Sequence, residues 1–385
     1  MRQGRVFRRG DSWSYVVDVN PPGATRKQRS KSGFRTKALA LRAMHEVQES
    51  IAIGRYVAPT SLTLGRYLTE LWLPAMRSTV RPTTWTSYEA YIRLYVVPRI
   101  GDLPLQSVSR NQLRIFYGEL EANGRVRGGG GLNPKTVHNV HVTLLKAFGD
   151  ALDDQLIPRN PAIRGHRGGA ARPVINTWTA DQVRAFLAHV ECDRLFALWR
   201  VAVATGMRRA EILGLRWVDV DFATKQIAVR QTRLKANGTT YFAGPKTQRS
   251  RRTIAVDATT LEILKGHLAA QARERLALGT NYTDEDLVFC FVDGKPLDPD
   301  GVTQRFQRHA RDANLPPMRF HGLRHTHATL GLQAEVNPKV MQERLGHSTV
   351  AFTLDIYSHA LPTMQGEAAQ RVAALFDDIP ETKSW

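Results

Sequence analysis

A basic, glycine-rich stretch at residues 164–173, RGHRGGAARP, restricts how this chain can fold more than any other feature. It offers no large apolar side chain to a core, and its glycines and terminal proline disfavour both helix and strand. The chain has 385 residues, which exceeds the length of one ordinary domain. We therefore interpret this stretch as a linker in a multidomain protein that is mainly α with small β-sheets.

The first domain is expected at residues 1–57, as a small β-sheet followed by one helix. GRVFRRGDSWSYVVDV alternates apolar and polar residues around a turn at Gly10-Asp11, and RKQRSKSGFRT could supply a third strand. TKALALRAMHEVQESIAIG has helical spacing that ends at Gly54. Residues 1–37 hold ten Lys or Arg and two Asp, a local charge of about +8 (10 − 2).

Positive charge indicates the class of partner. The chain has 54 Lys and Arg against 35 Asp and Glu, a net charge of +19, which suits a polyanion. It has neither a long apolar run nor a dominant basic amphipathic helix, so DNA is favoured over a membrane. In the first domain the charges share strands with Trp13, Tyr15 and Phe34, which favours DNA binding over a merely solubilising surface. The candidate DNA contacts there are Arg8, Arg9, Arg26, Lys27, Arg29 and Lys31.

A helical domain is expected at residues 61–166. TLGRYLTELWLPAM, RPTTWTSYEAYIRLYVVPRIG, SRNQLRIFYGELEA and NPKTVHNVHVTLLKAFGDALDDQLI all have helical spacing. RVRGGGGLNP, at residues 125–134, is interpreted as a loop, because no Gly-Lys-Ser/Thr follows its glycines as a phosphate-binding loop would require.

A mixed α+β domain is expected at residues 174–385. Its helices are predicted over TWTADQVRAFLAHV, with Thr179 and Gln182 as a capping box, over RLFALWRVAVATG and over MRRAEILGL. Strands are predicted over QIAVRQTRL, TTYFAG and RRTIAV, and further helices follow.

HGLRHTHATL, at residues 321–330, carries three histidines and one arginine. His321 and His325 have the spacing of two metal ligands on one helical face. A zinc protease would need Glu where Gly322 stands, and Arg324 would repel a cation. We therefore expect no metal, and packing roles for His325 and His327. Arginine is rarely buried without an anion, so Arg324 favours a phosphate partner.

Three other stretches supply groups suited to phosphate chemistry. Arg208 stands at a helix start with Glu211 three residues on, able to orient its guanidinium. Lys246 lies in a predicted turn between strands, with Arg249, Arg251 and Arg252 behind it, and His347 precedes Tyr357 by ten residues. Each alone has an ordinary explanation, as a surface charge, a solvated turn residue or one of ten tyrosines.

The joint order of these residues resembles the signature of the tyrosine recombinases, also called the phage integrase family: Arg, Lys, His-x-x-Arg, His, Tyr. The matching positions are Arg208 in TGMRRAEILGLRW, Lys246 in GPKTQRSRR, His321 and Arg324 in HGLRHTHATL, His347 in LGHS and Tyr357 in LDIYSH. Two positions depart from the family pattern: Gly322 is often acidic there, and His327 stands where an aromatic residue is common.

The resemblance implies three domains: an arm-type DNA-binding domain at 1–57, a helical core-binding domain at 61–166 and a catalytic domain at 174–385. It also implies a cofactor-free strand transferase whose nucleophile, Tyr357, forms a 3′-phosphotyrosyl ester with DNA. Arg208 and Arg324 would stabilise the phosphate charge, and Lys246 would protonate the leaving 5′-oxygen. His321 is the expected proton acceptor and His347 a phosphate hydrogen-bond donor, two roles that could be exchanged.

The expected function is a site-specific integrase of a mobile element. A type IB topoisomerase, a resolvase-type or chromosome-dimer recombinase, and a non-catalytic DNA-binding protein are the alternatives. The resemblance implies double-stranded attachment sites and a homotetramer on DNA, with an excisionase or DNA-bending protein as a further candidate partner. The tail LPTMQGEAAQRVAALFDDIP has helical spacing and could pack on its own domain or on the next protomer. Two cysteines form no disulfide framework, and no apolar segment follows the basic N-terminus, so a cytoplasmic, nucleoid-associated protein is expected.

Overall fold

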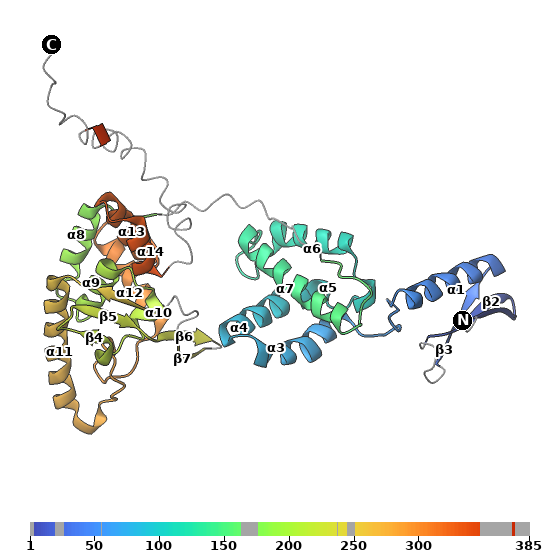
Figure 1. Cartoon of the computed structure of the whole chain (residues 1–385), viewed down its shortest axis with the longest axis horizontal. Coiled ribbons are helices and arrows are strands. Elements are labelled where there is room, and N and C mark those ends of the chain that lie inside the picture. Colours follow the sequence, from blue (N-terminus) through green and yellow to red (C-terminus); the bar gives the residue numbers. More distant parts are fainter. Residues whose placement is uncertain are drawn as a thin grey trace, which may run out of the picture. The chain divides into compact units, whose positions relative to one another are not determined.

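The computed structural model describes residues 4–19, 27–54, 56–162, 176–236, 238–244, 251–346 and 372–373. Over these ranges the chain is mainly helical, with small antiparallel sheets (Figure 1). It forms two compact units, Met1–Arg172 and Pro173–Trp385, divided inside the stretch RGHRGGAARP. The expected multidomain, mainly α fold with small sheets is confirmed.

The N-terminal part of the first unit is a three-stranded sheet with one helix. The strands β1 (Arg5–Arg9), β2 (Ser12–Asp18) and β3 (Gln28–Phe34) pair antiparallel in chain order, and α1 (Lys37–Ala52) follows. Gly10 has a φ of +59° between β1 and β2, a turn conformation that suits glycine. Buried Tyr15 and Val17 of β2 pack with Met44 of α1. The three strands and the helix expected from the sequence are confirmed.

The rest of the first unit consists of helices around a buried core. Two runs contain a π-helical segment: α2 (Leu64–Arg66), η1 (Tyr67–Trp72) and α3 (Leu73–Thr79), then α4 (Pro82–Tyr91), η2 (Ile92–Val96) and α5 (Val97–Ile100). The short η3 (Leu105–Ser107) precedes α6 (Arg110–Asn123) and α7 (Pro134–Asp153). Tyr67, Phe116 and Phe148 are among the fully buried side chains. RVRGGGGLNP is a loop up to Asn133, as predicted, with Gly128, Gly129 and Gly130 at positive φ.

In its described residues, the second unit packs helices against two small sheets. Its helices are α8 (Ala180–His189), α9 (Phe196–Thr205), α10 (Arg209–Ile212), η4 (Trp217–Asp219), α11 (Ala258–Leu278), η6 (Gly279–Asn281), α12 (Pro299–Asp312), α13 (Gly322–Gln333) and α14 (Pro338–Leu345). Its strands are β4 (Val220–Asp221), β5 (Gln226–Val229), β6 (Thr232–Ala236), β7 (Thr239–Ala243) and β8 (Arg252–Ala255). The sheets have the orders β4-β5-β8 and β6-β7.

The prediction of one strand over QIAVRQTRL is wrong, because the segment divides into β5 and β6, which belong to different sheets. Between them Gln231 Nε2 donates to the Gly214 carbonyl at 2.9 Å. Gly214 lies so close to β6 that an added Cβ would be 3.0 Å from the Thr232 Cα. The break therefore depends on a contact distant in sequence, which strand periodicity does not report.

Aromatic packing fixes the helices of the second unit. Trp199 of α9 lies 6.2 Å from Phe306 of α12 and 6.2 Å from Phe320, measured between ring centroids. Thr326 of α13 accepts a 3.0 Å hydrogen bond from the Trp178 backbone. His327 of α13 also contacts the Val203 carbonyl of α9 at 2.9 Å, which places the HGLRHTHATL segment against the end of α9. The capping box of Thr179 and Gln182 is confirmed, whereas the predicted tail helix lies outside the described residues except for 372–373.

Candidate active site

Arg208 stands where α9 ends and α10 begins. Gly206 ends α9 with a φ of +62°, and a Cβ there would lie 2.7 Å from both His327 Cδ2 and Leu345 Cδ2, so the turn requires glycine. The Arg208 side chain is 37% exposed, and its Nη1 donates to Glu211 Oε1 at 2.8 Å. The Arg208 backbone N–H donates to Glu211 Oε2 at 2.8 Å. The prediction that Glu211 orients this guanidinium is confirmed.

Glu211 also binds Arg252, a partnership that the sequence did not indicate. Arg252 Nη1 and Nη2 donate to the two carboxylate oxygens at 3.0 and 2.9 Å. Burial alone would raise the pKa of Glu211, but the hydrogen bonds and charge of Arg252, with the charge of Arg208, lower the pKa to about 2. The buried carboxylate therefore remains ionised and holds two guanidinium groups.

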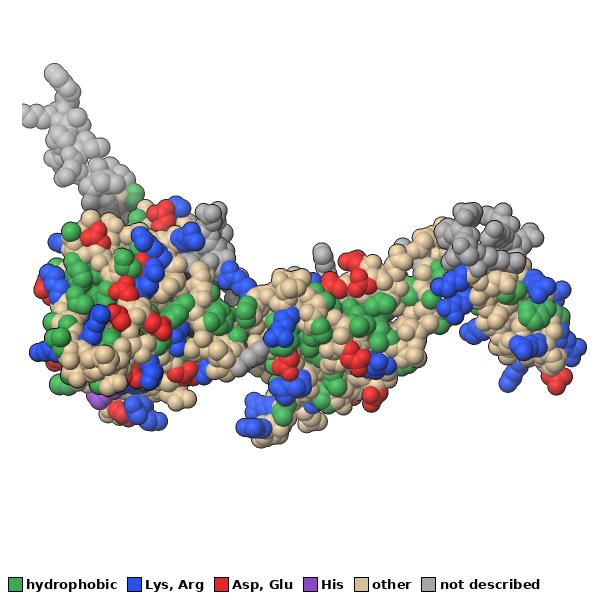
Figure 2. All heavy atoms as spheres, turned by 90° about the horizontal axis from the view of Figure 1, so that it is seen from below, with side chains coloured by type: hydrophobic (Ala, Val, Ile, Leu, Met, Phe, Trp, Pro, Cys, Tyr) green, Lys and Arg blue, Asp and Glu red, His purple; other side chains and the backbone are tan. Residues whose placement is uncertain are grey.

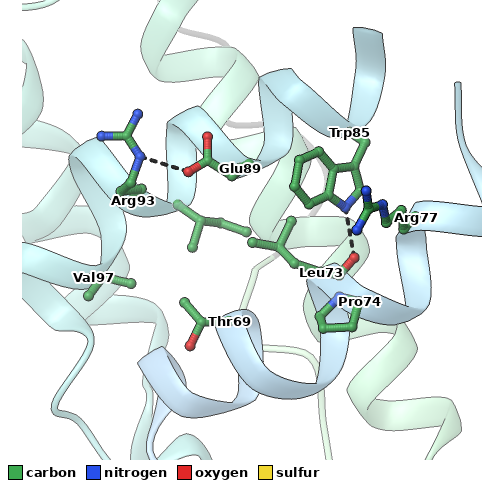
Figure 3. A pocket seen from close by; sticks show the side chains of 9 residues that line it. Thr69, Leu73, Pro74, Arg77, Trp85, Glu89, Arg93 and Val97 are labelled. Carbon is green, nitrogen blue, oxygen red and sulfur yellow. Dashed lines mark hydrogen bonds and ion pairs between the residues drawn. The ribbon is translucent and has the colours of Figure 1, made fainter. Parts of the chain in front are cut away.

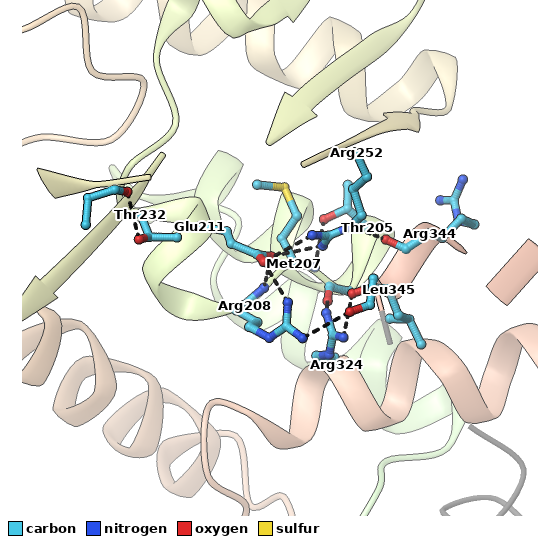
Figure 4. A network of polar contacts seen from close by, with 12 residues as sticks. Thr205, Met207, Arg208, Glu211, Thr232, Arg252, Arg324, Arg344 and Leu345 are labelled. Carbon is cyan, nitrogen blue, oxygen red and sulfur yellow. Dashed lines mark hydrogen bonds and ion pairs between the residues drawn. The ribbon is translucent and has the colours of Figure 1, made fainter. Parts of the chain in front are cut away.

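Arg324 of α13 also contacts the end of α9, close to Arg208. It is 2% exposed; its Nη1 donates to the Gly206 carbonyl at 3.0 Å and its Nη2 to the Leu345 carbonyl at 2.5 Å. Arg208 Nη2 donates to the next carbonyl, that of Gly346, at 3.3 Å. Figure 4 shows Arg208 and Arg324 approaching the end of α14 from different elements. The structure thus brings two of the predicted arginines together, with Arg208 as the more exposed member.

His321 precedes α13 and belongs to the same cluster of charges. Its side chain is exposed, and its ring lies 4.9 Å from that of His325 in an edge-on arrangement. Partial desolvation, followed by the positive charge of His325, Arg324 and Arg208, lowers the pKa of His321 to about 4. Near neutral pH the imidazole is therefore uncharged and can accept a proton.

The two departures from the family pattern have local explanations. At Gly322 an added Cβ would lie 2.2 Å from Met318 Cγ, so a larger residue would require Met318 to move. His327 is half-buried; its Nδ1–H donates to the Val203 carbonyl at 2.9 Å, and its buried Nε2 has no hydrogen-bond partner among the described residues. The packing role expected for His327 is confirmed.

Acid should destabilise the protein through His327, because burial lowers its pKa from 6.5 to about 4. As the pH falls, His327 is protonated in the unfolded chain before it is protonated in the folded protein. The contribution of the neutral imidazole to the free energy of unfolding is therefore fully present above pH 6.5 and is lost as the pH falls towards 4. At pH 5 we expect a loss of about 2 kcal/mol from this residue. Urea unfolding of His327→Phe should therefore depend less on pH between 7 and 5 than wild type does. His189→Phe, at an exposed position, is the control, and equal pH dependence in all three proteins would contradict the prediction.

Three members of the predicted catalytic set, Lys246, His347 and Tyr357, lie outside the described residues. Their assignment therefore rests on the sequence. Within the described residues, no group of three or more His, Cys, Asp or Glu side chains could hold a metal ion. None of the described helices is long and apolar enough to cross a bilayer.

The predicted DNA contacts of the N-terminal sheet do not share one face. Arg29 and Lys31 pair with Val17 and Tyr15, so they lie on the side that α1 covers, although both are exposed. Arg8 lies two residues after Val6 on β1, and Val6 packs on the side that α1 covers, so Arg8 lies on that side too. Arg9 points to the opposite, open face of the sheet.

The open face of the sheet carries a residue that the candidate set omitted. Arg5 lies two residues from Phe7 on β1 and stacks over its ring at 5.6 Å. Lys27 lies just before β3, and Arg26 is outside the described residues. In Figure 2 Lys and Arg predominate among the charged side chains visible on residues 4–54. The charge of this region is therefore distributed over both faces.

The helical part of the first unit contains an open pocket of about 430 Å³ (Figure 3). Leu73, Pro74, Trp85 and Ile92 are among its lining residues, and Arg77 lies over the Trp85 ring at 5.8 Å. Of the predicted site residues that the structure describes, none lines this pocket.

Comparisons with known proteins match the chain in three ranges. The "Phage integrase family" matches residues 176–364, the "Phage integrase, N-terminal SAM-like domain" residues 66–120, and the "Arm DNA-binding domain" residues 6–51. A "Tyrosine recombinase XerC-like" protein of Caldanaerobacter subterraneus is 26% identical over 361 residues, 89% of this chain and 90% of the relative. The "ICEBs1 integrase" of Bacillus subtilis is 26% identical over 373 residues, 94% of this chain and 97% of the relative.

Solved structures share the fold. An integrase of the Tn1549 transposon, in complex with transposon right end DNA, has a TM-score of 0.64 at 23% identity and covers 81% of this chain and 99% of its own. A lambda integrase dimer bound to a core site has a TM-score of 0.57 at 18% identity and covers 91% of this chain and 94% of its own.

Proposed function

Because the chain belongs to the phage integrase family of tyrosine recombinases, it is a site-specific DNA recombinase, and we propose that it integrates and excises a mobile element through a 3′-phosphotyrosyl intermediate on Tyr357. The observation that carries the proposal is the meeting of Arg208 and Arg324 at the end of α14. Two guanidinium groups on separate elements can bind the non-bridging oxygens of one phosphate and stabilise the charge that develops in phosphoryl transfer.

The proposed reaction exchanges one ester for another. The Tyr357 oxygen attacks the scissile phosphorus, and the bond to the 5′-oxygen breaks. His321, whose lowered pKa keeps the imidazole uncharged near neutral pH, takes the tyrosine proton, and Lys246 gives a proton to the leaving 5′-oxygen. His347 donates a hydrogen bond to the phosphate. A 5′-hydroxyl from another duplex then attacks the phosphotyrosyl ester, so strands are rejoined without an external energy source or a cofactor.

The proposed domains follow the sequence: an arm-type DNA-binding domain at 1–57, a core-binding domain at 61–166 and a catalytic domain at 174–385. The family matches to residues 6–51, 66–120 and 176–364 support these assignments. In the arm domain we propose that the open sheet face, with Arg5, Phe7 and Arg9, contacts the DNA, because α1 covers the other face. The matches to the N-terminal region favour an integrase over a type IB topoisomerase.

The assembly is proposed from relatives. Lambda integrase forms a tetramer on a Holliday junction, in a structure with 17% identity to this chain and a TM-score of 0.56. Recombination of two duplexes cuts four strands, which requires four copies of Tyr357. We therefore propose a homotetramer on paired attachment sites in the nucleoid, with an excisionase or a DNA-bending protein as a candidate accessory partner.

The proposal is tested by trapping the covalent intermediate. The full chain is incubated with a suicide substrate that carries the end of the mobile element, in buffer with EDTA, and the products are separated under denaturing conditions. A protein–DNA adduct with a free 5′-hydroxyl should form, because arginines rather than a metal ion carry the phosphate charge in the proposed mechanism. Absence of any adduct would contradict strand transferase chemistry. Supercoil relaxation without synapsis would favour the topoisomerase alternative instead.

A further inference from the structure

We propose that Arg252 is a positioning residue for strand cleavage, which fixes Arg208 through Glu211 and fixes the end of α14 through the Arg344 carbonyl. The inference rests on the proposed function. Arg252 is the first residue of β8, and its side chain is only 6% exposed, against 37% for Arg208. Its guanidinium donates to the Glu211 carboxylate and to the Arg344 carbonyl, both groups of the protein itself.

Glu211 is the first group that Arg252 holds. Each carboxylate oxygen accepts one bond from Arg252 and one from Arg208, at distances between 2.8 and 3.0 Å. A carboxylate bound by a planar guanidinium at both oxygens is fixed in orientation, not only in charge. Arg252 therefore sets the direction in which the remaining lone pairs of the Glu211 carboxylate face Arg208.

The end of α14 is the second group. The carbonyls of Arg344, Leu345 and Gly346 accept, in that order, from Arg252 at 2.5 Å, Arg324 at 2.5 Å and Arg208 at 3.3 Å. The last carbonyls of a helix lack intrahelical partners and carry partial negative charge, so they attract cations. Three arginines, from β8, from α13 and from the residue just before α10, thus share one helix end (Figure 4).

Loss of Arg252 would change both connections at once. Glu211 would keep Arg208 as its remaining guanidinium partner in this network, so the carboxylate edge that Arg252 now holds would draw Arg208 inward. The Arg344 carbonyl would lose its donor, and the end of α14 would be free to shift relative to β8. Arg208 would then offer its N–H groups to the scissile phosphate in a less favourable geometry, which lowers the cleavage rate more than DNA affinity.

The test compares Arg252→Ala with Arg194→Ala in single-turnover cleavage of the suicide substrate. Arg194 is a matched control, because it too holds a glutamate with both oxygens, Glu274 at 2.7 and 2.6 Å, and donates to a carbonyl, that of Cys290 at 2.7 Å. Within the described part of the chain, its hydrogen bonds go to none of the predicted catalytic residues. With protein in saturating excess, we expect Arg252→Ala to cleave at least tenfold more slowly, with a DNA dissociation constant within about threefold of wild type. Arg194→Ala should cleave within threefold of wild type at a comparable loss of thermal stability.

A double-mutant cycle with Arg208→Lys separates positioning from general destabilisation. If Arg252 acts through Arg208, Arg252→Ala should cost less than threefold in the Arg208→Lys background. The inference is overturned if the double variant is slowed by the product of the factors measured for Arg252→Ala and Arg208→Lys alone. It is also overturned if Arg252→Ala cleaves at the same rate as Arg194→Ala. If Arg252→Ala does not fold, Arg252→Lys and Arg252→Gln replace it, and cleavage by both at the wild-type rate would equally overturn it. Failure of the wild-type protein to form an adduct would instead refute the proposed function.

Discussion

Tyr357→Phe should form no covalent adduct with the suicide substrate, yet bind the intact site with wild-type affinity. Phenylalanine keeps the ring and lacks the oxygen that attacks phosphorus, so cleavage loses its nucleophile while DNA contacts made elsewhere persist. The effect on cleavage should be complete within the limits of detection. The measurement pairs denaturing gel analysis of the adduct with a DNA-binding titration of the same protein preparation.

A second tyrosine substitution controls for damage to the fold. Tyr282→Phe removes a hydroxyl that lies 3.5 Å from Cys290 Sγ, away from the arginine cluster, and should leave adduct formation unchanged. Peptide mapping of the wild-type adduct should identify the peptide that contains Tyr357. Residual nicking by Tyr357→Phe, or an adduct on another tyrosine, would show that the nucleophile is misassigned.

Arg208→Ala and Arg324→Ala should each slow cleavage on the order of 10²-fold or more, by analogy with the loss of one oxyanion donor. The structure predicts that the two substitutions differ in their effect on the stability of the fold. Arg208 is partly exposed, and Glu211 keeps Arg252 when Arg208 is removed, so Arg208→Ala should fold with little loss of stability. Arg324 is buried and serves the carbonyls of Gly206 and Leu345, so Arg324→Ala should also lower the melting temperature.

Arg216→Ala is the matched control for Arg208→Ala. Arg216 pairs with Asp219 three residues on, at 2.8 Å, and its side chain is 32% exposed, so it repeats the local geometry of Arg208 and Glu211 away from the cluster. Its removal should leave single-turnover cleavage within a few fold of wild type. Rates of Arg208→Ala no lower than those of Arg216→Ala would refute the role of Arg208 in phosphate binding.

Local chemistry made part of the site predictable from the sequence. The i, i+3 spacing of Arg208 and Glu211 at a helix start indicated that the carboxylate orients the guanidinium, and the structure confirms it. The same reasoning placed Arg252 in an undifferentiated basic run with Arg249 and Arg251. Its pairing with Glu211 spans 41 residues, and neither spacing nor composition reports which arginine of such a run turns inward.

The region with the N-terminal sheet shows a second limit of the same kind. Its strands and helix follow from alternation and turn residues, and they were predicted. The face on which each arginine lies depends on register, and Gly33, with a φ of +95°, accompanies a register shift between Trp13 and Tyr15. A shift of one residue moves a side chain to the opposite face of the sheet. The candidate DNA contacts could therefore be named by charge but not sorted by face.

The backbone carbonyls at the end of α14 determine which kinds of sequence change the site can tolerate. Every amino acid supplies a backbone carbonyl, so substitution at positions 344 and 345 leaves the acceptors for Arg252 and Arg324 chemically unchanged. An insertion or deletion of one residue in α14 is a different event, because it would rotate all three carbonyls by about 100° around the helix axis. The site should therefore tolerate drift in side-chain identity around the arginines while remaining intolerant of changes in helix length.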